Sequence, residues 1–330
     1  MEYFKREGDK TICLLCAHYC ALKEGQKGIC GVNQNVQGAL KNLVFGYPVT
    51  LHVDPVEKKP LYHFLPDSRT LSLGTIGCNF KCSFCQNWSI SQEKSLHVKE
   101  FIAPSKIIEM ALKYECASIA YTYNEPTVFY PYAKEIALLA HQSGIKNIFV
   151  TNGFESKEVI ADMSGLIDAC NVDLKSFDED YYKKKLGGSL DVVLENLITL
   201  QKMGMWIEIT TLIVPTHNDS DEELHAIASF IAQNLGVHTP WHISAFHPDY
   251  HEQELPRTPT YTLTRTEAIG RSVGLKHIYI GNTNLPTQTR CSNCDAVLIR
   301  RNGFDVRDNF LHDGFCPQCH TPLQGVFNAY

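Results

Sequence analysis

The chain has 330 residues, of which 44% are hydrophobic and 20% charged, so it can bury a large core and carry small additional modules. Its formal net charge of -6 argues against a broad nucleic-acid surface, because such surfaces carry an excess of Lys and Arg. The N-terminal residues are polar, and no stretch approaches the roughly 18 apolar residues of a membrane span. We therefore expect a cytoplasmic protein that does not enter membranes.

The 13 cysteines form three groups and leave two single residues. Grouped thiols in a chain without a secretion signal favour metal ligation over disulfides. The groups are Cys13, Cys16, Cys20 and Cys30; then Cys78, Cys82 and Cys85; then Cys291, Cys294, Cys316 and Cys319. Cys116 and Cys170 adjoin apolar runs and are expected to be small buried residues.

The first cysteine group lies in a segment punctuated by glycines, residues 13–32, which predicts a loop. Four thiolates in so short a span can close a metal site. Their uneven spacing favours zinc, and the alternative is an auxiliary iron–sulfur cluster that relays electrons or anchors a substrate. Short strands are predicted at 43–47 and 50–53, and residues 1–65 are expected to form an N-terminal cysteine-rich module.

From about residue 71 the chain alternates strand and helix signals, which is typical of a parallel β/α fold. Strands are predicted at 71–76, 117–122, 146–151, 169–174, 206–214 and 241–246. Amphipathic helices are predicted near 104–115, 127–142, 156–164, 189–203 and 220–234, with Ser105, Ser156 and either Asp219 or Ser220 as N-caps. A helix near 264–273 and a strand at 276–280 would add a seventh unit. The predicted fold class is α/β, a partial (β/α)6 barrel of the TIM type over residues 66–284.

The second cysteine group follows the first predicted barrel strand with the spacing Cys78-x3-Cys82-x2-Cys85. Three thiolates on one loop suit a [4Fe-4S] cluster in which one iron lacks a protein ligand. A structural zinc ion needs a closed shell of four ligands. A zinc knuckle that takes its fourth ligand from elsewhere is the alternative.

Polar residues follow the predicted strands at their carboxyl ends, where an α/β barrel places its chemistry. They are Asn124, Glu125, Thr151, Asn152, Asp173, Lys175 and His242. Together with the cysteine loop, they would suit a zwitterionic ligand that carries an amine, a carboxylate and hydroxyl groups. Ordinary turn and cap chemistry is the alternative for each one taken alone, and above all for Asn152 before Gly153.

The third cysteine group has two Cys-x2-Cys pairs separated by 21 residues, which is a zinc-ribbon pattern. A single iron of the rubredoxin type is the alternative. Residues 285–330 are therefore expected to form a zinc-ribbon-like module. Its arginines predict a solvated basic face, and they are Arg290, Arg300, Arg301 and Arg307.

The central cysteine loop resembles the signature of the radical S-adenosylmethionine (SAM) enzymes, including an aromatic residue, Phe84, before the last cysteine. Further motifs extend the likeness over nearly the whole chain. It is similar to the radical SAM enzymes related to pyruvate formate-lyase activating enzyme, and within that group to those of the AmmeMemoRadiSam system. The motifs are Cys13-x2-Cys16-x3-Cys20, Cys30-Gly31-Val32, Glu57 to Tyr62, Gly77 to Phe80, Tyr123 to Pro126, Val172 to Lys175 and Trp206 to Thr211.

The resemblance implies a cluster held by Cys78, Cys82 and Cys85, with SAM bound to its open iron. Reductive cleavage of SAM would then give a 5'-deoxyadenosyl radical that abstracts a hydrogen atom. The protein would supply positioning and the exclusion of water, while the cofactors supply the bond cleavage.

The resemblance also assigns residues to parts of SAM. Asn124 and Glu125 take the place of a Gly-Gly-Glu turn, with Glu125 at the ammonium group. Asp173 and Lys175 would hold the methionine and ribose portions, and His242 would lie near the sulfonium. One position departs from the pattern, because Val150 stands where activating enzymes often carry an aspartate for the ribose.

The implied substrate is a group on a protein or peptide. The implied partners are an electron donor such as flavodoxin or ferredoxin, and proteins of the MEMO and AMMECR types. A competing hypothesis is a non-catalytic scaffold whose metal-bound cysteines support protein or RNA binding. That hypothesis does not account for the polar residues at the strand ends.

Overall fold

A computed structural model describes residues 2–328 of the chain, and its central element is an 8-stranded sheet. The strand order is β13-β12-β11-β10-β9-β8-β7-β6, in which only β6 runs antiparallel to its neighbour. The strands are β6 (Thr50–Pro55), β7 (Arg69–Gly74), β8 (Ser118–Tyr121), β9 (Lys146–Thr151), β10 (Ala169–Asp173), β11 (Trp206–Ile213), β12 (Trp241–Ala245) and β13 (Ile278–Gly281). The predicted α/β fold is confirmed, and the seventh parallel unit is present.

Helices cover the sheet, because parallel strands need both faces shielded from water. They are α2 (Pro104–Lys113), α3 (Tyr130–Gln142), α4 (Lys157–Met163), α6 (Leu190–Lys202), α7 (Asp221–Phe230) and α8 (Thr260–Ser272), with the short α1 (Trp88–Ser91) and α5 (Glu179–Tyr181). The turns Val56–Lys58 and Pro126–Phe129 are 3-10 helices, and Tyr182–Leu186 and Ile231–Leu235 are π-helical. None of the helices described within residues 2–328 is long and apolar enough to cross a membrane.

Two of the predicted helix caps are confirmed and one is wrong. Ser156 and Ser220 accept hydrogen bonds from backbone amides of the first helical turn. Ser105 does not cap α2, because Ala103 is the N-cap and Pro104 takes the first helical position. Proline suits that position since its missing N–H would have no partner there.

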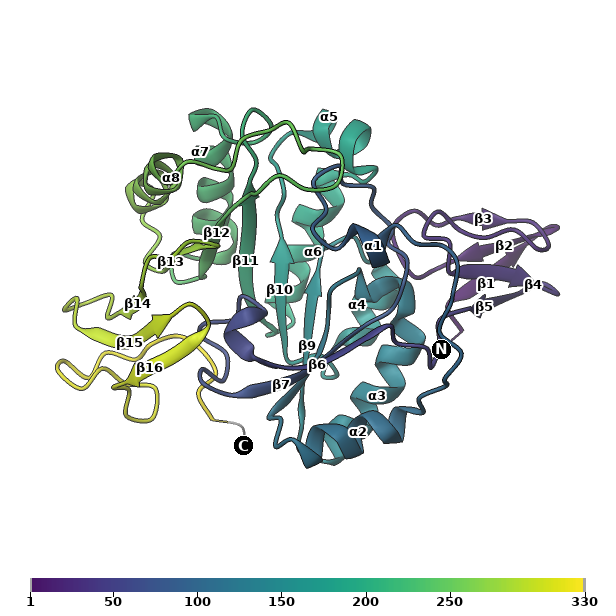
Figure 1. The fold of residues 1–330 in the computed structure, drawn as a ribbon, viewed down its shortest axis with the longest axis horizontal. Coiled ribbons are helices and arrows are strands. Elements are labelled where there is room, and N and C mark those ends of the chain that lie inside the picture. Colours follow the sequence, from purple (N-terminus) through teal and green to yellow (C-terminus); the bar gives the residue numbers. More distant parts are fainter. Residues whose placement is uncertain (1, 329–330) are drawn as a thin grey trace.

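The N-terminal part carries small antiparallel sheets on one side of the barrel (Figure 1). Its strands are β1 (Phe4–Glu7), β2 (Lys10–Cys13), β3 (Ala21–Leu22), β4 (Asn33–Val36) and β5 (Ala39–Asn42). The strand predicted at 43–47 is wrong, because these residues form turns and Gly46 has a φ of 81°. The strand predicted at 50–53 is confirmed as β6 and belongs to the central sheet.

The C-terminal part is a three-stranded antiparallel sheet on the opposite side of the barrel (Figure 1). Its strands are β14 (Thr287–Arg290), β15 (Val297–Asn302) and β16 (Asp305–Asn309). Arg301 on β15 is not solvated, contrary to the sequence-based expectation. Its side chain is fully buried, forms an ion pair with Glu57 at 3.4 Å, and donates to the carbonyl of Tyr62 at 2.8 Å.

The β6–β7 loop (residues 56–68) crosses the open side of the barrel, since β6 and β13 are the two edges of the sheet. The side-chain nitrogen of Asn171 on β10 donates to the carbonyl of Pro60 at 2.7 Å. The ring of His63 lies 2.5 Å from the hydroxyl of Tyr279 on β13 and 2.8 Å from the carbonyl of Gln324. The loop therefore joins the sheet to the C-terminal part.

Candidate active site

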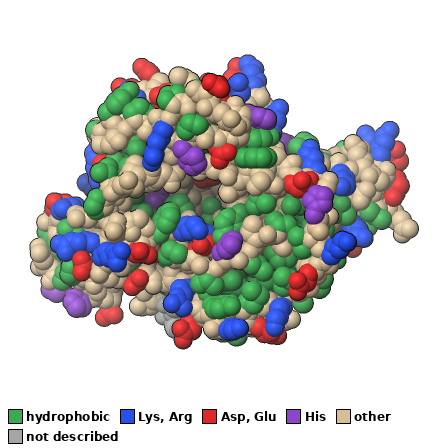
Figure 2. All heavy atoms as spheres, viewed as in Figure 1, with side chains coloured by type: hydrophobic (Ala, Val, Ile, Leu, Met, Phe, Trp, Pro, Cys, Tyr) green, Lys and Arg blue, Asp and Glu red, His purple; other side chains and the backbone are tan. Residues whose placement is uncertain are grey.

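A cavity of about 430 Å³ lies at the carboxyl ends of the parallel strands, and Figure 2 shows a hollow near the middle of the corresponding face. All residues predicted to form the central site line this cavity. They are Cys78, Cys82, Phe84, Cys85, Asn124, Glu125, Thr151, Asn152, Asp173, Lys175 and His242. The structure thus brings together the cysteine loop and side chains on or just after the four strands β8, β9, β10 and β12. A cavity of this size suits a small-molecule ligand.

The cysteine loop is fixed at its start by Asn124. The side-chain nitrogen of Asn124 donates to the carbonyl of Gly77 at 2.7 Å, and its oxygen accepts from the amide of Thr75 at 2.9 Å. Gly77 has a φ of 86°, and a Cβ there would lie 2.7 Å from the carbonyl of Cys30. Only glycine fits this position, so the backbone can bend directly before Cys78.

Of the three central cysteines, Cys82 is buried, whereas Cys78 and Cys85 are partly exposed. Burial and then the charge of Glu125 raise the pKa of Cys78 well above its usual range. Burial raises the pKa of Cys82 to about 12, although the charge of Lys175 acts in the opposite direction. These thiols need a cation nearby to become thiolates, and a bound metal centre supplies that charge.

The arrangement of Cys78, Cys82 and Cys85 fits a multinuclear cluster better than one metal ion. Within residues 2–328, these three sulfur atoms do not all lie within 4.8 Å of one another. Four metal atoms in a cube hold their thiolates farther apart than one metal atom does. In addition, the buried side-chain nitrogen of Asn79 has no hydrogen-bond partner in the described chain. Donors beside cluster sulfurs tune iron–sulfur centres, so the donor set fits the implied [4Fe-4S] group.

Glu125 is buried and accepts several hydrogen bonds. Its Oε1 accepts from the amide and hydroxyl of Thr127 and from the hydroxyl of Thr151 at 2.9 Å. Its Oε2 accepts from the amide of Asn152 at 2.8 Å. A carboxylate oxygen can accept more than one bond, so Oε2 can take a further donor. Burial raises the pKa of Glu125, whereas these donors lower it.

A second buried carboxylate, Glu155, lies behind Glu125. The hydroxyl of Thr151 is within hydrogen-bond distance of both carboxylates, at 2.5 Å from Glu155. Burial and the charge of Glu125 raise the pKa of Glu155 to about 7. Sequence analysis missed Glu155, since it follows the strand-end motif and shows no spacing signal of its own.

Asp173 and Lys175 follow β10 and form an ion pair of 2.7 Å beside the cavity. Burial alone would lower the pKa of Lys175, but the charges of Asp173 and Cys82 raise it well above its usual range. Lys175 therefore stays protonated. Its side chain is only 16% exposed, while that of Asp173 is 34% exposed and more open to a ligand.

His242 on β12 is oriented by a buried glutamate that sequence analysis also missed. Its Nε2 lies 2.6 Å from Glu208 on β11. Glu208 further accepts from the amides of Tyr62 and His63 in the β6–β7 loop, at 2.9 and 2.7 Å. Burial would raise the pKa of Glu208, but the hydrogen bond and charge of His242 hold it below its usual value. Side chains alternate between the two faces of a strand, so the sequence of β11 already indicated that Glu208 shares a face with Thr210.

Other cavity residues come from parts of the chain that the sequence analysis did not assign to the site. Lys59, Pro60 and Tyr62 belong to the β6–β7 loop, and Phe304 lies between β15 and β16. Val150 also lines the cavity. The C-terminal part therefore contributes a side chain to the same site as the central cysteines.

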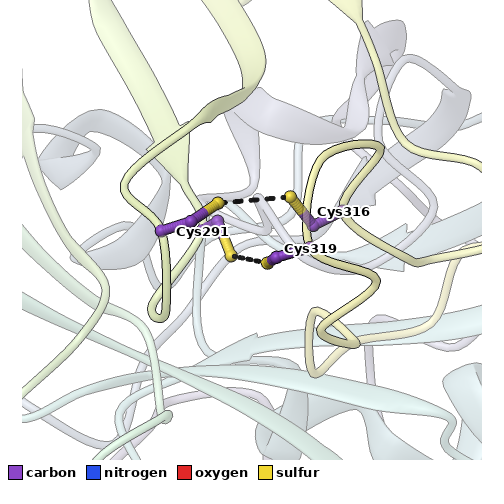
Figure 3. Close-up of side chains that lie close together, drawn as sticks. Cys291, Cys316 and Cys319 are labelled. Atoms are coloured by element: carbon purple, nitrogen blue, oxygen red, sulfur yellow. Dashed lines mark hydrogen bonds between the residues drawn. The ribbon is translucent and has the colours of Figure 1, made fainter.

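The C-terminal cysteines form a compact set whose side chains point toward one another (Figure 3). The sulfur atoms of Cys291 and Cys319 are 3.5 Å apart, and those of Cys294 and Cys316 are 3.6 Å apart. All four lie within 4.8 Å of one another. Zn–S bonds of about 2.3 Å in a tetrahedron give sulfur separations near these values. This set could hold a single metal ion.

The model for the radical SAM superfamily matches residues 73–231. The chain is 40% identical over 93% of its length, and 92% of the relative, to the uncharacterized protein MJ0808 of Methanocaldococcus jannaschii. It is 29% identical over 50% of its length, and 64% of the relative, to the putative glycyl-radical enzyme activating enzyme MJ1632 of the same organism. It is also 24% identical to the pyruvate formate-lyase-activating enzyme of Clostridium pasteurianum, over 47% of this chain and 66% of the relative.

A solved structure supports the same fold. The radical SAM methyltransferase from Sphaerobacter thermophilus superposes with a TM-score of 0.53 at 14% identity, over 67% of this chain and 68% of the methyltransferase. The matched superfamily region contains the cysteine loop and the strand ends that carry Glu125, Asp173 and Lys175. Residues 73–231 therefore form a radical SAM domain, and the whole chain belongs to one family with MJ0808.

Proposed function

We propose that the protein reductively cleaves SAM at a [4Fe-4S] cluster and uses the resulting 5'-deoxyadenosyl radical to abstract hydrogen from a protein or peptide. The observation that carries this proposal is the shared cavity. Three cysteines face the same space as Glu125, the Asp173–Lys175 pair and His242. A non-catalytic scaffold would not require these charged groups around its cysteines.

When bound, the cluster and SAM supply the electron transfer and the homolytic cleavage. Cys78, Cys82 and Cys85 hold the cluster, and Asn124 fixes the loop that carries them. Glu125 receives the ammonium of SAM through Oε2, which has one protein donor. Asp173 is the more exposed member of its ion pair and accepts from ligand hydroxyl groups.

His242 and Lys175 complete the binding of SAM in this proposal. Glu208 fixes the ring of His242 against the cavity wall. Lys175 supplies a positive charge beside Cys82, which stabilises the thiolate. Val150 offers no hydrogen bond, so the ribose is held by other cavity residues such as Asp173.

The relatives named as activating enzymes support a protein substrate. One is the putative glycyl-radical enzyme activating enzyme, and another is the benzylsuccinate synthase activating enzyme of Thauera aromatica, 27% identical over 37% of this chain and 38% of the relative. The proposed electron donor is a flavodoxin or ferredoxin. Partners of the MEMO and AMMECR types are proposed on the family resemblance.

The C-terminal set is proposed to hold a structural zinc ion. Hydrogen bonds from Thr321 lower the pKa of Cys319 to about 5, which favours the thiolate that zinc requires. Cys316→Ser should remove about one zinc per chain and leave iron unchanged. Loss of iron with zinc retained would show that this set holds iron, as in the rubredoxin alternative.

The function is tested with anaerobically reconstituted protein, a strong reductant and SAM. The wild type should form 5'-deoxyadenosine, and the triple variant Cys78→Ala, Cys82→Ala, Cys85→Ala should form none. Cys116→Ala is the matched control, because this cysteine lies outside all three groups. Continued SAM cleavage by the triple variant would overturn the proposal.

The binding roles are tested by titrating SAM into variants that retain the cluster spectrum. Asp173→Asn and Glu125→Gln should each weaken SAM binding by about 10-fold to 100-fold, since each removes a charge-assisted contact. Asp180→Asn is the control, because that side chain is 71% exposed. Unchanged affinity in both variants would assign these roles to other cavity residues.

A further inference from the structure

We propose that Cys13, Cys16, Cys20 and Cys30 hold a second iron–sulfur cluster beside the central one. This reverses the preference for zinc that the spacing along the chain gave. The inference does not depend on SAM cleavage, since it concerns cysteines outside the cavity.

The four N-terminal thiols gather at one place. Cys13, Cys16 and Cys30 are buried, and Cys20 is partly exposed. The backbone amide of Cys13 donates to the carbonyl of Cys20 at 3.0 Å, and a Cβ on Gly28, two residues before Cys30, would lie 3.6 Å from the sulfur of Cys20. Such a group is stable as thiolates only when a metal centre balances the charge.

The spacing of these sulfurs differs from that of the C-terminal set in the same molecule. All four C-terminal sulfurs lie within 4.8 Å of one another, as one tetrahedral ion requires. No three of the four N-terminal sulfurs do so, although all are among the described residues. The N-terminal set shares this wider spacing with Cys78, Cys82 and Cys85. A centre with several metal atoms accounts for both.

A polar donor lies beside one of the N-terminal sulfurs. The side-chain nitrogen of Asn33 lies 3.5 Å from the sulfur of Cys30. Hydrogen bonds to cysteine sulfurs are one of the means by which proteins set the potential of an iron–sulfur cluster.

The N-terminal set also touches the central cysteine loop directly. The ring Nε2 of His18, which lies between Cys16 and Cys20, is 2.9 Å from the carbonyl of Asn79. The carbonyl of Cys30 packs so closely on Gly77 that a Cβ there would lie 2.7 Å from it. The loops that carry the two sets of ligands are therefore in direct contact. Two reduced clusters at these positions should interact magnetically.

Metal content of the anaerobically reconstituted full chain tests the proposal. The wild type should bind about eight irons, because each [4Fe-4S] cluster contributes four. The double variant Cys16→Ser, Cys20→Ser should bind about four irons and retain its zinc. Cys116→Ser is the matched control and should keep about eight irons. A wild type with about four irons and two zincs, and a double variant that loses zinc, would overturn the proposal.

A second variant keeps the test decisive if the N-terminal substitutions prevent folding. The triple variant Cys78→Ala, Cys82→Ala, Cys85→Ala leaves the N-terminal set intact and should retain about four irons. When reduced, it should show an iron–sulfur electron paramagnetic resonance signal that SAM does not change. Absence of iron from this variant would refute the second cluster. Retention of iron without SAM cleavage in the wild type would instead refute only the proposed function.

The contact between the two sites has its own readout. The spectrum of fully reduced wild type should show spin–spin broadening that is absent from both the double and the triple variant. A wild-type spectrum equal to the sum of the two variant spectra would overturn the placement of the clusters side by side.

Discussion

The two cysteine-rich parts that flank the barrel use the same ligand type in different ways (Figure 1). The C-terminal part has closely spaced sulfurs and joins the barrel through the buried side chain of Arg301. In the N-terminal part no three of the four sulfurs lie within 4.8 Å of one another, and this part contacts the central cysteine loop through His18 and Cys30. The number of thiols is the same, so the two sets differ in the separation of their sulfur atoms and in the parts of the molecule that they contact.

The strongest test of this comparison is Arg301→Met. It should lower the free energy of unfolding by about 3–5 kcal/mol, because it leaves the buried carboxylate of Glu57 without its charged partner. The matched control is Arg300→Met on the same strand, whose ion pair with Asp308 is about half exposed. That control should change stability by less than about 1 kcal/mol. Chemical denaturation of the metal-loaded proteins measures both, and equal effects would contradict the anchoring role of Arg301.

Acid should destabilise the region where the β6–β7 loop meets the C-terminal part. Burial lowers the pKa of both His63 and His277 to about 3 in the folded protein, against about 6.5 in the unfolded chain. The unfolded chain therefore binds protons between these values that the folded chain does not. The stability that these histidines contribute is complete above pH 6.5 and falls with decreasing pH. The expected loss between pH 6.5 and pH 5 is about 2 kcal/mol for each histidine.

Unfolding free energies of the wild type at a series of pH values test this prediction. His277→Gln removes one of the two groups and should reduce the slope of stability against pH by about one proton. His225→Gln is the control, because His225 is exposed on α7. A slope in the His277 variant that matches that of the wild type would show that this histidine does not resist protonation.

The smallest effect is expected on the N-terminal side. His18→Phe removes one hydrogen bond to the carbonyl of Asn79 and should lower the free energy of unfolding by about 1 kcal/mol. His225→Phe, at an exposed site, should change it by less than about 0.5 kcal/mol. If His18→Phe lowered the free energy of unfolding as much as Arg301→Met does, the N-terminal and C-terminal parts would not differ in how strongly they are anchored to the barrel.

Much of the barrel and of its site could be predicted from sequence because both depend on local patterns. The strand predicted at 146–151 is β9 with the same bounds. The polar residues after each strand were found because parallel strands end at one edge of the barrel. Asn124 and Asn152 were predicted as ligand contacts, yet the structure shows their amides bonded to the protein, with Asn152 donating to Asn79 at 2.7 Å.

The remaining features depend on partners that lie far apart in the chain. From the sequence, Arg301 was predicted to be a solvated charge, because its partner Glu57 is 244 residues away in the chain. In the sequence, Glu208 is a single polar residue within a predicted strand. Its role in orienting a histidine becomes visible only when His242 on the neighbouring strand is placed beside it. Spacing along the chain could not decide the metal at the N-terminal cysteines, because the ligand separations are set by the loops between them.

The contacts of the β6–β7 loop impose an order on the assembly of this protein. Its His63 donates a hydrogen bond to the carbonyl of Gln324, 261 positions later in the sequence, and its Glu57 pairs with Arg301. During synthesis the N-terminal residues emerge first, so this loop is made long before either partner exists. Until then, a carboxylate destined for the interior has no counter-charge, and the adjoining cavity wall is incomplete. The β6–β7 loop can therefore make its final contacts only after residues 301–324 have been synthesised.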